Sequence, residues 1–182
     1  MISSFPQMAN AFRHLGEAFA RKVFMRELIP SHETVYNDRD LRVINMALAL
    51  LERRIRHREA MTSPEDVKAY LRLKLEHRER EAFVALFLNN QHRLIACEFL
   101  FAGTLDRVEV HPHEVVRRAL LLNAAAVIFA HNHPSGNAEP SNTDRQITTT
   151  LVNALSQINV RVLDHIVVGH GEMVSFAERG WL

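Results

Sequence analysis

The sequence predicts an α/β layered domain over residues 62–182, with a central mixed β-sheet flanked by helices and a helical N-terminal extension over residues 1–61. Short apolar runs bounded by turn residues, which are typical of strands, alternate with segments whose apolar residues recur every three or four positions, which are typical of helices. A chain of 182 residues is also long enough for one domain with a peripheral extension.

Two amphipathic helices account for the predicted extension. Five apolar residues at helical spacing predict a helix near residues 7–25. These are Met8, Phe12, Leu15, Phe19 and Val23. We expect this helix to cover the chain's own core, and contact between two copies in a homodimer is the less favoured alternative. A polar linker over residues 31–40 precedes a second helix, predicted from Leu41 to Ile55, which ends in the basic run Arg53–Arg58.

The first half of the domain contains a helix and a hairpin. Ser63-Pro64-Glu65-Asp66 predicts a helix start, because serine caps, proline suits the first helical position and acids favour the first turn. We expect this helix to reach about Arg80. Phe83–Leu88 is apolar throughout and predicts a central strand, and Leu94–Phe101 predicts its hairpin partner after a polar turn.

The second half alternates helices and strands. Helical spacing predicts a helix over Glu114–Leu122 and another from Ser141 to about Leu155. Apolar runs predict strands over Ala124–His131 and Val160–Val168, and a short strand over Met173–Phe176.

Charge, cysteine content and hydropathy indicate the compartment and the kinds of partner to expect. The formal net charge of +1 does not require a polyanionic partner. The single cysteine, Cys97, excludes an internal disulfide, fits a reducing compartment, and is expected to be a buried, inert thiol. No apolar stretch reaches the length of a membrane span and no signal-peptide core follows the N-terminus. We therefore expect a cytoplasmic protein with no membrane partner.

The clearest chemical signal follows the predicted strand that ends at His131. Side chains two apart on a strand point to the same side, so His131 and His133 can reach one point. A loop rich in proline and glycine then leads to Asp144, in the first turn of the next helix. Two imidazoles and one carboxylate are zinc ligands, and three protein ligands leave a fourth position for water. This set is typical of a catalytic metal site.

Simpler interpretations exist for each part of this pattern. Ser141 and Asp144 after Pro140 resemble a capping box, which needs no metal. The two histidines alone could be a polar strand end that meets solvent. The conjunction of paired histidines, a tight loop and a nearby carboxylate favours the metal site.

Two other segments contain histidines for which a simpler interpretation than a metal site is favoured. His111-Pro112-His113 repeats the His-x-His spacing, but no third ligand is apparent, and capping with solvent exposure is expected. Asp164-His165 is expected to make a structural hydrogen bond, with lining of the cleft as the alternative.

His-x-His, seven residues, serine, two residues and aspartate form a pattern that resembles the JAMM motif of the JAB/MPN zinc metalloproteases. The sequence His131-Asn132-His133-Pro134-Ser135-Gly136 is similar to that of the RadC-like branch of this family. Further segments resemble this branch: Phe83–Asn89, Gly103-Thr104-Leu105, Glu114-Val115-Val116, Leu163-Asp164-His165 and Val174-Ser175-Phe176. The resemblance implies an MPN domain over residues 62–182, with a cytidine-deaminase-like layered fold.

The resemblance also implies residue roles. One Zn²⁺ ion per chain would be bound by His131, His133 and Asp144. Ser141 would lie close to the metal and donate a hydrogen bond to the oxyanion of a tetrahedral intermediate.

A general base is also implied, in the form of a glutamate before the first central strand. Glu81 matches the RadC-like pattern best, and Glu76 and Glu79 are the alternatives. The simpler interpretation of each is a solvated residue at a charged helix end.

The implied activity is that of a zinc metallopeptidase, in which metal-activated water attacks an amide or isopeptide bond of a peptide or protein substrate. One alternative is a DNA-repair-associated accessory protein that binds DNA. Its only candidate phosphate contact is the basic run Arg53–Arg58, so a nucleic-acid partner has weak support. The other alternative is a catalytically silent MPN scaffold.

Overall fold

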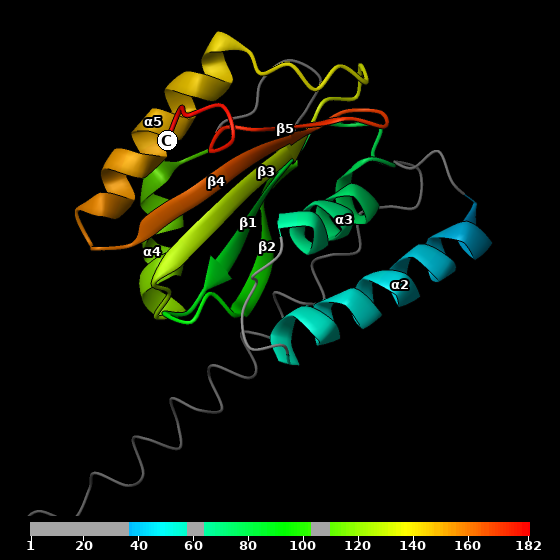
Figure 1. Cartoon of the computed structure of the whole chain (residues 1–182), viewed down its shortest axis with the longest axis horizontal. Coiled ribbons are helices and arrows are strands. Elements are labelled where there is room, and N and C mark those ends of the chain that lie inside the picture. The colour runs from blue at the N-terminus through cyan, green and yellow to red at the C-terminus, as the bar shows by residue number, and fades with distance from the viewer. Residues whose placement is uncertain (1–36, 58–63, 103–109) are drawn as a thin grey trace, which may run out of the picture. The chain divides into compact units, whose positions relative to one another are not determined.

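The structure is a computed structural model that describes residues 37–57, 64–102 and 110–182, without the side chains of residues 54–57 and 101–102 (Figure 1). The predicted helix near residues 7–25, the Ser63 cap and the Gly103-Thr104-Leu105 segment lie outside these ranges. The described elements, in chain order, are α2 (Asp38–His57), α3 (Pro64–Leu75), β1 (Ala82–Leu88), β2 (Leu94–Ala102), α4 (Pro112–Leu121), β3 (Ala126–Asn132), α5 (Asn142–Ser156), β4 (Arg161–Val168) and β5 (Met173–Ser175).

The five strands form one mixed sheet in the order β2-β1-β3-β4-β5. β1 is antiparallel to both β2 and β3, whereas β3 and β4 are parallel, with α5 as their connection. β5 closes the edge as an antiparallel neighbour of β4. The predicted mixed sheet flanked by helices is therefore confirmed. Among the described helices, none combines the length and the apolarity that crossing a bilayer requires.

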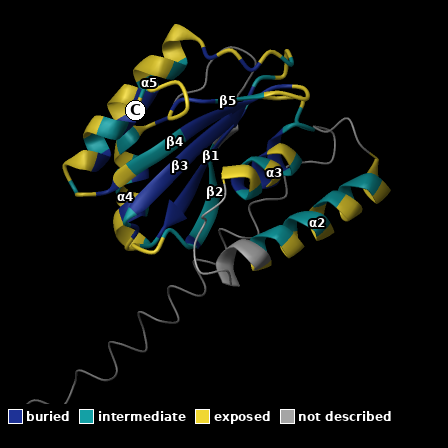
Figure 2. Cartoon of the chain, viewed as in Figure 1, coloured by how far each residue is buried: buried dark blue, intermediate teal, exposed yellow. Residues whose placement is uncertain are grey.

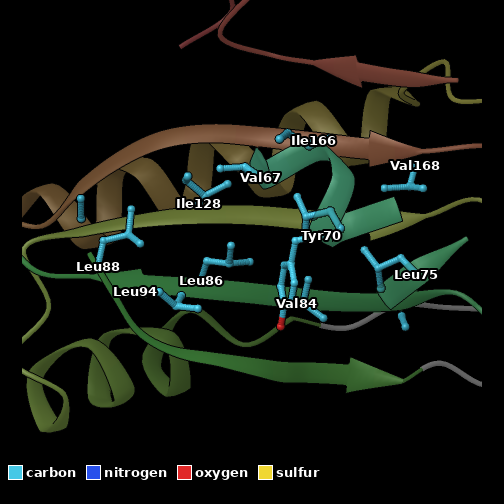
Figure 3. Close-up of a cluster of buried hydrophobic side chains, with 14 residues drawn as sticks. Val67, Tyr70, Leu75, Val84, Leu86, Leu88, Leu94, Ile128, Ile166 and Val168 are labelled. Atoms are coloured by element: carbon cyan, nitrogen blue, oxygen red, sulfur yellow. The ribbon is translucent and has the colours of Figure 1, made fainter. Parts of the chain in front are cut away.

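Helices cover both faces of the sheet, which gives three layers. Alternate side chains of a strand point to opposite faces, and every residue of β1 and β3 is buried. Val84, Leu86 and Leu88 of β1 pack with α3 on one face (Figure 3). Phe83 and Phe87 pack with α4 and α5 on the other face. The strands are mostly dark blue in Figure 2, while the outer side of α5 is yellow.

α2 belongs to the predicted extension but contacts α3 and β2. Leu48 and Leu51 pack against the α3-side core, and the Tyr70 hydroxyl of α3 donates to Glu52 over 2.5 Å. Burial, together with Cys97 and this carboxylate, raises the pKa of Tyr70 well above its usual value. The thiol of Cys97 is half-buried, not buried as predicted, because β2 is an edge strand.

Two helix boundaries differ from the prediction. α2 begins at Asp38, inside the predicted linker, because the Asn37 side chain accepts hydrogen bonds from the backbone N–H groups of Arg39 and Asp40. α3 ends at Leu75, five residues before the predicted end at Arg80. The chain must turn there to enter β1, and a side chain from β3 holds the turn.

That side chain is Asn132, which is 1% exposed. Its oxygen accepts from the backbone N–H of Ala82 at 2.9 Å, and its amide nitrogen donates to the carbonyls of Arg78 and Arg80, both at 3.2 Å. These three bonds tie the α3–β1 turn to the end of β3. They also hold the backbone on both sides of Glu81.

Asn132→Ala is expected to lower the free energy of unfolding by about 2–4 kcal/mol, because it removes three hydrogen bonds and leaves the buried backbone N–H of Ala82 without this acceptor. Urea unfolding followed by circular dichroism measures this change. Asn153→Ala is the matched control, since Asn153 is exposed on α5 and should shift stability by less than about 0.5 kcal/mol. Equal stability of the two variants would contradict the role given to Asn132.

Candidate metal centre

The two histidines of the His-x-His pair converge. His131 is the second-last residue of β3 and is fully buried, and His133 follows the strand directly. Their Nε2 atoms lie 3.0 Å apart. The expected placement of both imidazoles on one side of the strand end is therefore what the structure has.

Asp144 arrives beside them from the first turn of α5. Its Oδ1 lies 3.3 Å from His131 Nε2, and its Oδ2 lies 3.6 Å from His133 Nε2. Asp144 also completes a capping box with Ser141, the N-cap of α5. Its Oδ2 accepts from the Ser141 backbone N–H at 2.7 Å and from the Ser141 hydroxyl at 2.6 Å. The capping box and the convergent carboxylate are thus one arrangement, because the cap orients the carboxylate toward the histidines.

The donor atoms fit a metal ion. One ligand atom from each of the three side chains lies within 4.8 Å of the other two, and the described part of the chain holds no other such group. Metal–ligand bonds of about 2.0–2.1 Å in tetrahedral geometry place neighbouring ligand atoms about 3.3 Å apart. The separation of 3.0 Å between the two Nε2 atoms and that of 3.3 Å between His131 Nε2 and Asp144 Oδ1 lie near this value.

The loop after β3 orients the ring of His133. Its Nδ1 lies 2.8 Å from the backbone carbonyl of Asn137, so Nδ1–H donates and Nε2 presents a lone pair to the site. Gly136 has φ +86°, and a Cβ there would come within 2.7 Å of the His170 ring. This close approach, together with the positive φ, accounts for glycine at this position.

The protonation states of Asp144 and His133 depend on their close contact in the site. Burial alone would raise the pKa of Asp144, but its interactions with the adjacent His131 and His133 outweigh burial and hold this pKa well below its usual value. The nearby Asp144 carboxylate raises the pKa of His133. The carboxylate therefore stays ionised at neutral pH, which favours cation binding.

Glu81 lies next to the same centre. β1 runs antiparallel to β3 with Phe83 opposite His131, so Glu81, two residues earlier, is on the same face and across from His133. Burial raises the pKa of Glu81, while its interactions with His131 and His133 oppose the rise and that with Asp144 adds to it.

The other two candidate glutamates have different surroundings. Glu76 accepts from the backbone N–H of Gly171 at 2.7 Å and pairs with Arg72 at 3.7 Å. Glu79 is exposed. Glu81 is therefore the glutamate that interacts electrostatically with the two histidines and Asp144.

His165 was not assigned to the site from the sequence. It is fully buried on β4, with its Nε2 2.9 Å from His131 Nδ1 and its Nδ1 2.5 Å from Thr148 Oγ1 of α5. Burial lowers the pKa of His165 well below its usual value. The signal for this contact is the β3–β4 register, in which Phe129 is opposite His165, and the sequence alone does not show a register.

Asp164 makes the structural hydrogen bonds that were expected of it. It accepts from the Ser175 hydroxyl at 2.6 Å and from the backbone N–H of Ala177 at 3.0 Å. These bonds join β4 to the last residue of β5 and to the chain that follows it.

The second His-x-His pair, His111 and His113, is exposed as expected. His111 occupies the N-cap position of α4 but makes no side-chain cap, contrary to the expected capping role, and its ring lies 5.7 Å from that of His113. In the basic run, Arg53 is exposed and the side chains of residues 54–58 lie outside the described ranges.

This three-layer α/β domain, in which a His-x-His strand end meets an aspartate from a capped helix start, is of the JAB class. The model of the RadC-like JAB domain matches residues 61–181. The chain therefore belongs to the RadC-like JAB domain family.

Relatives with this domain are close in sequence. UPF0758 protein VP0184 of Vibrio parahaemolyticus is 56% identical over 140 residues, and UPF0758 protein VCM66_0205 of Vibrio cholerae is 57% identical over 140 residues. UPF0758 protein VFMJ11_0123 of Aliivibrio fischeri is 54% identical over the same length. Each match covers 77% of this chain but 62% of the relative. The names of these relatives state no activity.

Proposed function

We propose that this chain is a zinc-dependent hydrolase of amide bonds, acting as a metallopeptidase or isopeptidase on a peptide or protein substrate. The observation that carries the proposal is the convergence of the Nε2 atoms of His131 and His133 with the carboxylate of Asp144, next to the half-buried carboxylate of Glu81. Three ligands of this type, with a nearby carboxylate, are the pattern of a catalytic zinc site. Membership of the JAB family, which includes metalloproteases, supports the same assignment.

His131, His133 and Asp144 would hold one zinc ion per chain. Bound there, zinc would lower the pKa of a coordinated water to about 7 and would polarise the substrate carbonyl. His131 is fully buried, whereas the side chains of His133 and Asp144 are 18% and 13% exposed, so solvent and substrate would approach from the side of His133.

Glu81 would be the general base. A carboxylate whose pKa is raised by burial accepts a proton more readily at neutral pH than a solvated one. Glu81 would take the proton of the attacking water on a carboxylate oxygen and deliver it to the leaving amine nitrogen.

Ser141 would stabilise the oxyanion. Its hydroxyl now donates to Asp144 Oδ2, and its oxygen accepts from the Asp144 backbone N–H at 3.2 Å. The second bond can remain while the hydroxyl proton turns to a developing negative charge on the substrate oxygen. Because Ser141 is exposed, a substrate can reach this hydroxyl.

Hydrolysis is tested with the zinc-loaded chain and two probes: a mixed peptide library and a synthetic peptide with an isopeptide bond to a lysine side chain. We expect new amino termini or released lysine amines by mass spectrometry, with loss of product after chelation and recovery on adding zinc. His111→Ala should leave the rate unchanged. A fully zinc-loaded chain that cleaves neither probe would favour the silent scaffold.

A further inference from the structure

A chain of hydrogen bonds runs behind the metal centre. His131 Nδ1 lies 2.9 Å from His165 Nε2, and His165 Nδ1 lies 2.5 Å from the Thr148 hydroxyl. Thr148 Oγ1 lies 2.5 Å from the backbone carbonyl oxygen of Asp144. This series of hydrogen bonds therefore begins at the side chain of one proposed ligand, His131, and ends at the backbone carbonyl of another, Asp144.

The backbone carbonyl of Asp144 determines which atom donates and which accepts in each of these hydrogen bonds. A backbone carbonyl can only accept, so the single hydroxyl proton of Thr148 satisfies the Asp144 carbonyl. His165 Nδ1–H then donates to the Thr148 oxygen. His165 is neutral because it is completely buried and, within the described residues, no carboxylate hydrogen-bonds its ring, so its Nε2 carries a lone pair. That lone pair accepts from His131 Nδ1–H and leaves the lone pair of His131 Nε2 for a metal.

We propose that His165 and Thr148 are positioning residues that hold His131 in its metal-binding tautomer. This inference rests on the proposed function, because it concerns the same centre. If Thr148 instead donated to His165, His165 would donate to His131, and the Nε2 of His131 would carry a proton toward Asp144. The hydrogen bond from Thr148 to the Asp144 carbonyl opposes that arrangement.

Aromatic packing holds the two rings in place. Phe83 stacks on His131 with ring centroids 5.9 Å apart and planes 7° apart, and its ring meets His165 edge-on at 5.2 Å. Phe176 also packs on His165, with ring centroids 4.8 Å apart. These contacts limit rotation of both imidazoles and so hold the direction of the Nε2 lone pair, while the hydrogen bonds set the tautomer.

Thr148→Val tests the proposal with little change in volume. It removes the acceptor of His165 Nδ1–H, and we expect zinc affinity, measured by competition with a chromogenic chelator, to fall 10–100-fold. Thr148→Ser restores the hydroxyl and should recover most of the affinity. Thr149→Val is the matched control, because Thr149 also bonds the carbonyl four residues earlier, at 3.0 Å, but is exposed; its affinity should equal that of the wild type.

Nitrogen NMR of the imidazole rings gives a second readout, independent of turnover. In the zinc-loaded chain, His165 should be protonated on Nδ1 and His131 on Nδ1, with His131 Nε2 bound to the metal. In Thr148→Val, the proton of His165 should move toward Nε2. Protonation of wild-type His165 on Nε2 would overturn the proposal, as would equal zinc affinity of Thr148→Val and Thr149→Val. A wild-type chain that binds no zinc would instead refute the metal site itself.

Discussion

His131→Ala is expected to reduce the zinc content from about one ion per chain to near zero. His131 supplies one of three ligand atoms, and its Nε2 is the atom nearest to both partners, at 3.0 Å from His133 and 3.3 Å from Asp144. Two remaining ligands do not make a stable zinc site at physiological metal concentrations. Elemental analysis of protein purified without added chelator measures the loss.

Thermal unfolding gives a second measure of the same effect. Zinc that binds only the folded chain stabilises it by about 2.7 kcal/mol when free zinc exceeds its Kd 100-fold. The wild type should therefore melt at a higher temperature with zinc than without it, and His131→Ala should show no such shift. His113→Ala, which alters the exposed second histidine pair, should behave as the wild type.

Because His131 is fully buried, Asp144→Asn serves as a variant that preserves shape. Its amide oxygen can still accept the capping hydrogen bond from Ser141, but the ligand charge is lost. We expect a folded variant with strongly reduced zinc content. Wild-type zinc content in both His131→Ala and Asp144→Asn would refute the ligand assignment.

Glu81→Gln is expected to lower kcat by about 10²–10⁴-fold while zinc content stays at one per chain. Glutamine keeps the size of the side chain but cannot accept the proton of the attacking water. Glu79→Gln is the matched control, because Glu79 is exposed in the same segment, and its kcat should not change. Equal activity of the two variants would exclude Glu81 as the base.

The raised pKa of Glu81 also predicts how activity and stability change with pH. Glu81 must be ionised to act as a base, and burial raises its pKa above the ordinary value of 4.5. Wild-type activity should therefore fall as the pH decreases through this raised pKa. A group with a raised folded-state pKa favours folding at low pH and loses that contribution as the pH rises. Metal-free Glu81→Gln should thus be at least as stable as the wild type at pH 7, with a smaller difference below pH 4.5.

Several elements follow from local sequence alone. β1 and β2 were predicted within one residue at each end, because an uninterrupted apolar run and a polar turn define them without help from the rest of the chain. α5 was predicted equally well from Ser141 and Asp144, whose capping box lies within a single turn. The start of α2 was missed although its signal, the Asn37 cap, is also local.

The end of α3 was missed for a different reason. Its residues continue the helical pattern toward Arg80, but the helix ends at Leu75. The hydrogen bonds of Asn132 come from a residue more than 50 positions away in the chain. Local propensity cannot include such a contact, and in this case the tertiary contact prevails.

By itself, the sequence determined the proposed ligand set, because His131, His133 and Asp144 lie within 14 residues that a strand end, a loop and a capped helix bring together. Only the tertiary structure decided what surrounds those ligands. The β1–β3 register places Glu81 and Phe83 at the centre, and the β3–β4 register places His165 behind His131. The physical reason is that strand register depends on side chains from distant segments packing into a common core, and no single segment carries that information.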